Sequence, residues 1–159
     1  MCLIVDNSVR DRVFLKPDDK DFGKLHSCLF GKGRPAVMIV YGGKLKREYF
    51  ERDKIKNLLR ELVRAGRARI VDDGQVDQEM AIVIASGLCR SDDEHIIALA
   101  RVAKVRLLCT DDGDLKRDFS SKTLINHVRG KVYGHARHKH LLERFCGNPN
   151  TQVVRRRRR

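Results

Sequence analysis

The sequence has no run of 18 or more apolar residues, so we expect no helix that spans a membrane. Its first ten residues, MCLIVDNSVR, carry no basic stretch ahead of the short apolar run, unlike a secretory signal peptide. We therefore expect a cytoplasmic protein. Its five cysteines are odd in number, and no two of them lie close together. This spacing favours reduced, mostly buried thiols over disulfides or a zinc site.

Several familiar catalytic motifs are also absent. The sequence contains no G-x-S-x-G elbow, no H-E-x-x-H, no phosphate loop of the G-x-x-x-x-G-K-[ST] type and no G-x-G-x-x-G. A phosphatase of the haloacid-dehalogenase type would need Asp-x-Asp after its first strand, whereas this chain has Asp6-Asn7-Ser8. A receiver domain would need a Lys at the end of its last strand, and none is evident.

Negative charge is scarce relative to positive charge, since the chain has 34 Lys and Arg but 21 Asp and Glu, and its formal net charge is +13. A protein this basic is expected to bind a polyanion. Residues 44–69 and 129–159 each carry ten Lys or Arg, whereas residues 70–95 carry seven acids and one Arg. An acidic centre between basic surfaces suits a nuclease, which needs carboxylates for metal and cations for the phosphate backbone. The alternative is a protein whose charged faces are merely solvated.

Solidly apolar segments alternate along the chain with segments of helical spacing. This alternation predicts an α/β fold with a mostly parallel central sheet covered by helices on both faces. We expect one domain over residues 1–146 and a flexible basic tail over 147–159. The predicted strands are residues 2–6, 36–41, 68–71 and 105–110, with weaker candidates at 124–125 and 131–133. The predicted helices start near residue 9 and cover residues 18–29, 44–66 in up to two pieces, 74–86, 92–103 capped by Ser91, 114–119 and 138–145.

Carboxylates gather where the predicted strands end. Ligands of parallel α/β sheets bind outside the carboxyl ends of the strands. Four carboxylates at one site repel one another unless a cation offsets their charge, and oxygen ligands suit Mg²⁺ or Mn²⁺. Such a metal lowers the pKa of a bound water and stabilises charge on a phosphodiester, so no nucleophilic side chain is needed. The candidate acids are Asp6, Glu48, Asp92, Asp93, Asp111 and Asp112.

The segments IVDNSV, LKREY, DDEHIIALA and LLCTDDGDL, in this order, resemble the PIN-domain nucleases. The resemblance covers residues 2 to about 145. It implies a three-layer α/β/α fold, metal-dependent cleavage of RNA and, in many members, a homodimer. Many small prokaryotic members are VapC-type toxins of toxin–antitoxin pairs, which an antitoxin protein holds inactive.

The resemblance also assigns residues. It implies Asp6, Glu48, Asp93 and Asp112 as catalytic residues and metal ligands, Asp114 as an auxiliary ligand, Ser8 as the small polar residue near the first acid, and Asp92 as the fallback for Asp93.

Other interpretations stay open at this point. The chain could be a catalytically silent PIN-like module that binds RNA or acts as a scaffold, because the same charge distribution would serve it. Three histidines near the C-terminus, His135, His138 and His140, lack a clear fourth zinc ligand, so we favour a basic segment that contacts phosphate. The five terminal arginines could hold RNA or an acidic partner, or simply keep the end soluble. Four cations either line the RNA path or form a solvated helix face: Lys44, Lys46, Arg47 and Arg52.

Overall fold

The structure is a computed structural model that describes residues 2–32, 37–127 and 129–145. In this part of the chain, eight α-helices and two 3-10 helices accompany a single sheet of five strands. The elements in chain order are β1 (Cys2–Val5), η1 (Asn7–Val9), α1 (Arg10–Leu15), α2 (Gly23–Phe30), β2 (Met38–Gly42), α3 (Gly43–Phe50), α4 (Asp53–Arg64), β3 (Ala68–Val71), α5 (Asp73–Ser86), α6 (Glu94–Ala103), β4 (Leu107–Cys109), α7 (Gly113–Ser120), β5 (Lys131–Tyr133), η2 (Ala136–His138) and α8 (Lys139–Phe145).

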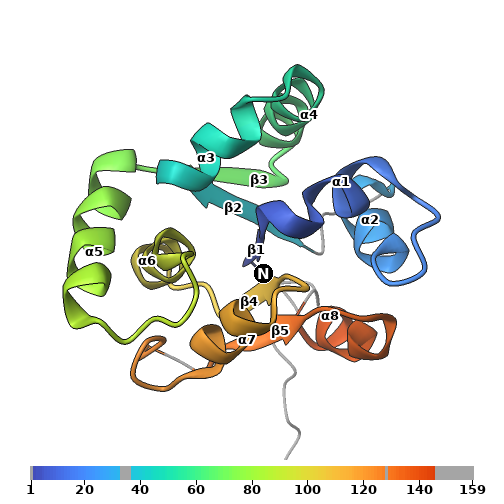
Figure 1. Cartoon of the computed structure of the whole chain (residues 1–159). Helices are drawn as coiled ribbons and strands as arrows, with labels where there is room; N and C mark the ends of the chain where they lie inside the picture. The colour runs from blue at the N-terminus through green and yellow to red at the C-terminus, as the bar shows by residue number, and fades with distance from the viewer. Residues whose placement is uncertain (1, 33–36, 128, 146–159) are drawn as a thin grey trace, which may run out of the picture.

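The sheet confirms the predicted fold class. All four pairings between neighbouring strands are parallel, and the strand order is β3-β2-β1-β4-β5. Helices α5 and α6 lie on one side of the sheet, and α1, α2 and α8 lie on the other (Figure 1). The result is a three-layer α/β/α architecture. From β1 the chain builds outward through β2 and β3, then returns to place β4 and β5 on the other side of β1.

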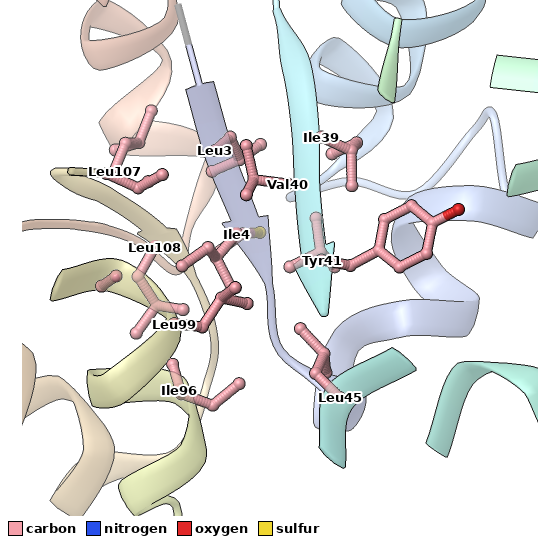
Figure 2. Close-up of a cluster of buried hydrophobic side chains, with 14 of the residues drawn as sticks. Leu3, Ile4, Ile39, Val40, Tyr41, Leu45, Ile96, Leu99, Leu107 and Leu108 are labelled. Atoms are coloured by element: carbon pink, nitrogen blue, oxygen red, sulfur yellow. The ribbon is translucent and has the colours of Figure 1, made fainter. Parts of the chain in front are cut away.

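The core lies between the central strands and the helices that cover them. Figure 2 shows Ile4 and Leu108 of neighbouring strands beside Leu99 and Ile96 of α6. All four side chains are fully buried. Burial on both faces explains why the central strands read as continuous apolar runs instead of alternating patterns.

The turn from β2 into α3 depends on two glycines, Gly42 and Gly43. A Cβ on Gly42 would lie 2.6 Å from the carbonyl oxygen of Val71 in the neighbouring strand. Gly43 has a φ of 55°, a left-handed conformation that glycine adopts most easily. The chain can therefore enter α3 directly from β2, and this turn fixes where Glu48 lies relative to the sheet.

Several predicted boundaries shifted. The predicted helix over 44–66 is two helices, α3 and α4, and the second predicted helix begins only at Gly23. Before it, the carboxylate of Asp19 accepts the backbone N–H groups of Asp21 and Phe22 and so holds the chain in a turn. The predicted cap at Ser91 is wrong, because α6 begins at Glu94. Within the described residues, 124–125 are buried but belong to no strand.

Two further predictions meet the structure only in part. No helix within residues 2–32, 37–127 and 129–145 is long and apolar enough to cross a membrane. The cysteines that the structure describes are free thiols: Cys2, Cys28, Cys89 and Cys109. Cys146 and the predicted tail over 147–159 lie outside the described residues, so the predicted domain boundary stays a prediction.

Candidate active site

The candidate site lies where the strand order reverses. In open parallel sheets, ligands bind at the carboxyl ends of the strands next to such a reversal. Here the reversal falls between β1 and β4, whose last residues, Val5 and Cys109, pair with each other. Asp6 directly follows β1, and its N–H donates to the carbonyl of Cys109 at 2.8 Å. Asp112 comes three residues after the end of β4, so the fold brings two of the predicted acids to this point.

Asp6 is held by two hydroxyl groups. The Oδ2 atom of this buried carboxylate accepts hydrogen bonds from the Oγ of Ser8 and from the Oγ1 of Thr110, the latter at 2.8 Å. Thr110 is itself fully buried, and its Oγ1 also accepts the N–H of Asp112 at 3.1 Å. Thr110 therefore links the acid after β1 to the acid after β4. The resemblance to PIN-domain nucleases implies Ser8 at this place, whereas the role of Thr110 becomes visible only in the fold.

Asp112 also caps a helix. Its Oδ1 accepts the N–H of Leu115 at 2.7 Å, which satisfies one of the free donors in the first turn of α7. This contact fixes one carboxylate oxygen. In the described residues the second oxygen, Oδ2, has no partner. The helix cap thus uses one oxygen of Asp112 and leaves the other for a further ligand.

Asp93 sits immediately before α6 and is surrounded by the other acids. Burial, and then the negative charges of Asp6, Asp112 and Glu48, raise the pKa of Asp93 from 3.8 to about 6. The side chain makes no cap hydrogen bond to α6. Asp92, the fallback, is exposed. The structure therefore gathers four predicted acids and favours Asp93 over its neighbour.

Glu48 approaches the group from α3. Burial raises the pKa of Glu48, the charge of Lys44 opposes this rise, and the charge of Asp6 adds to it. Its carboxylate lies 3.8 Å from the Nζ of Lys44 and 3.5 Å from the Nε2 of His95. His95 is buried, and burial together with the charges of Lys44 and Arg47 lowers its pKa to about 4. A neutral imidazole forms no ion pair, so we interpret the contact between His95 and Glu48 as polar packing.

A buried carboxylate supports the segment that carries Asp93. Asp118 of α7 is 3% exposed and accepts the N–H groups of Arg90 and Ser91 together with the Oγ–H of Ser91. These bonds hold the turn just before Asp93 against α7. The sequence predicts Ser91 as a helix cap, whereas no pattern in it points to Asp118.

Asp114 is not part of this arrangement, whereas Lys44 adjoins it through Glu48. Asp114 is 56% exposed at its side chain, pairs with Arg117 at 3.3 Å, and is not among the charges that act on Asp93. The four cations expected to contact RNA are each paired with a carboxylate of the chain itself. The pairs are Lys44–Glu48, Lys46–Asp73, Arg47–Asp77 and Arg52–Asp11.

The donor atoms of the site suit a hard divalent cation. Within the described residues no group of three His, Cys, Asp or Glu side chains is arranged to hold a metal ion. However, Asp6 and Asp112 are each anchored through one oxygen, and their second oxygen has no partner in the described part of the chain. Burial raises the pKa of Asp93, and repulsion from Asp6, Asp112 and Glu48 adds to this rise; a bound cation would relieve that repulsion. All-oxygen ligands of this kind fit Mg²⁺ or Mn²⁺.

The pKa of Asp93 leads to a prediction about stability without metal. Because the pKa is higher in the folded chain, the folded state binds more protons between about pH 4 and pH 6. The free energy of unfolding should therefore fall as pH rises through this window. We expect Asp93→Asn to stabilise the metal-free protein by about 1 kcal/mol at pH 8, after allowance for solvent screening, and to have little effect near pH 4. Urea unfolding at both pH values checks this, and an equal effect at both would contradict it.

Comparison with known proteins supplies no relative. Neither the models of known protein families, nor the curated proteins, nor the solved structures include a match to this chain.

Proposed function

We propose that this protein is a divalent-metal-dependent endoribonuclease of the PIN type, which hydrolyses RNA phosphodiester bonds. One observation carries the proposal. Four carboxylates from four separate segments lie close together where the strand order reverses, and burial, together with the charges of the other three, raises the pKa of Asp93 to about 6. The excess of positive charge over the whole chain supports a polyanionic substrate.

Each residue of the site has a defined task in this proposal. Asp6, Glu48, Asp93 and Asp112 would hold Mg²⁺ or Mn²⁺. When bound, the metal supplies Lewis acidity that activates a water and stabilises charge on the phosphodiester. Thr110 keeps one oxygen of Asp6 fixed by its hydrogen bond, and α7 does the same for Asp112, so the acids are oriented before substrate arrives. His95, neutral and buried, packs beside Glu48 without adding charge.

We further propose, on the resemblance to PIN-domain nucleases, that the chain acts in the cytoplasm. The same resemblance suggests a homodimer and, in a toxin–antitoxin pair, an antitoxin partner that blocks the site.

A second candidate function is a catalytically silent PIN-like module that binds RNA. A specific observation favours it, because in the described part of the chain no three acidic, histidine or cysteine side chains already stand in a metal-binding arrangement. The basic surface would serve this function equally well.

Cleavage of RNA separates the two functions. Purified protein should cut a mixture of structured and single-stranded RNAs in Mn²⁺ or Mg²⁺ and should not cut them in EDTA. Salt-sensitive RNA binding without cleavage in either metal would support the silent module instead.

A further inference from the structure

A basic pocket runs along β5, and one end of it reaches the edge of the sheet where the acids lie. It has a volume of about 440 Å³, within the usual range for small-ligand sites. None of the described residues that line it is acidic. Its charged and titratable lining residues are Lys116, Arg129, Lys131, His135, Arg137 and His138.

Among the described residues, the Lys and Arg side chains of this pocket form no ion pair, whereas His135 lies 3.6 Å from the carboxylate of Asp21. Lys116 donates to the backbone carbonyl of Asp111 at 3.1 Å, which leaves its charge unbalanced. Neither Lys131 nor Arg137 forms an ion pair with a carboxylate in the part of the chain that the structure describes. The cations of α3 differ in this respect, because each of them is already paired. Unpaired cations that face one cavity without a carboxylate create a site for an anion.

The surroundings of His138 indicate how much positive charge is concentrated there. Its Nδ1 accepts the N–H of Gly134 at 3.1 Å, so its Nε2 remains available to donate. Burial lowers the pKa of His138, and the charges of Arg137, His135 and others nearby lower it further. The charged groups that act on this imidazole, Arg137, His135, His140 and Lys116, are all positive when charged.

Lys116 connects the pocket to the acids. Cys109 and Tyr133, the last residues of β4 and β5, pair with each other, so Asp111 and Gly134 follow neighbouring strand ends. A Cβ on Gly134 would lie 3.0 Å from the Cε of Lys116, while the Nζ of Lys116 reaches the carbonyl of Asp111. The pocket is therefore next to the segment that carries Asp112.

We infer that this pocket binds a phosphate group of the RNA strand that flanks the bond cut at the carboxylates. Two guanidinium and two ammonium groups around one cavity are the donors that phosphate oxygens prefer. The assignment to a substrate strand rests on the proposed function, whereas the pocket's affinity for phosphate does not.

The test measures RNA binding in EDTA, where cleavage plays no part. The variant Lys131→Gln/Arg137→Gln removes two cations of the pocket. Its matched control, Lys24→Gln/Lys54→Gln, removes two exposed cations elsewhere. We expect fluorescence anisotropy to show about tenfold weaker binding of a short single-stranded RNA to the pocket variant, with a salt slope smaller by about 0.7. The control variant should bind like the wild type, and both variants should melt at the wild-type temperature.

A second arm identifies the source of the phosphate. Inorganic phosphate should shift the amide resonances of Gly130 and Gly134 in the wild type and not in the pocket variant. Equal loss of RNA affinity in both double variants would overturn the inference, because only overall charge would then matter. Phosphate shifts combined with unchanged RNA binding would also overturn it, by showing a site for free phosphate alone. Loss of RNA binding without metal-dependent cleavage by the wild type would support the pocket and reject the nuclease.

Discussion

Replacing either Asp6 or Asp112 with Asn is expected to reduce metal-dependent RNA cleavage by more than about a hundredfold. Loss of a residue that merely supports a metal ligand costs about 10- to 100-fold, and these carboxylates are assigned as the ligands themselves. Asparagine preserves the shape of the side chain and can still accept from Thr110 at position 6 or from the N–H of Leu115 at position 112. The fold should therefore persist, and initial cleavage rates with circular dichroism spectra check both parts.

Asp18→Asn is a suitable control for this pair. Asp18 is exposed in the turn before α2 and lies outside the proposed site. Its replacement removes one negative charge and should leave cleavage within about twofold of the wild type. Full activity in both Asp6→Asn and Asp112→Asn would remove these carboxylates from the mechanism.

Asp118→Ala is expected to lower the free energy of unfolding by about 3 kcal/mol. The change leaves the N–H groups of Arg90 and Ser91 and the hydroxyl of Ser91 without their acceptor in a buried location. Unsatisfied buried donors, and the loss of a charged acceptor, account for a penalty of this size. Because the same turn leads into Asp93, cleavage should fall as well. Urea denaturation at pH 7 measures the stability change.

Two controls separate this effect from a general loss of charge. Asp18→Ala removes an exposed carboxylate and should change stability by no more than about 0.5 kcal/mol. Asp118→Asn keeps one oxygen as an acceptor and should cost less than Asp118→Ala. A stability for Asp118→Ala equal to that of the wild type would show that these hydrogen bonds contribute little.

The fold could be predicted because the central strands of its sheet are buried on both faces. Segments such as CLIVD and AVMIVY are apolar throughout, a pattern that central parallel strands produce and solvent-facing strands do not. The first residues of the helices were harder to predict. Ser91 precedes a helical pattern and has the chemistry of a cap, but Asp118, 27 residues later in the chain, binds it instead. Local patterns contain no information about such a distant partner.

The proximity of Asp6 and Asp112 could be predicted from their positions after two strands, whose carboxyl ends a parallel sheet brings to one edge, whereas the choice of Glu48 and Asp93 came from the family resemblance. The contacts that support these acids could not be predicted from the sequence. Thr110 and Asp6 are separated by 104 positions in the chain, and only the pairing of β1 with β4 brings their side chains together. His95 lies in an apolar helix and has the pattern of an ordinary core residue, although it borders Glu48.

Sequence patterns also do not show which carboxylates pair with the cations of α3. The Lys- and Arg-rich segment of α3 looked like an RNA-binding surface, but its partners, Asp73 and Asp77, come from α5. Most of the basic groups that line the pocket lie within residues 129–138, and Lys116 of α7 joins them because β4 pairs with β5. Charge counts along the chain therefore suggest a polyanionic partner without showing which surface would bind it.

Calorimetric titration of the wild type with Mn²⁺ decides whether the four carboxylates hold a divalent cation. We expect saturable binding of Mn²⁺ that is lost in Asp112→Asn and retained in Asp18→Asn. Absence of Mn²⁺ binding by the folded wild type, or equal binding by all three proteins, would show that these carboxylates do not form a metal site.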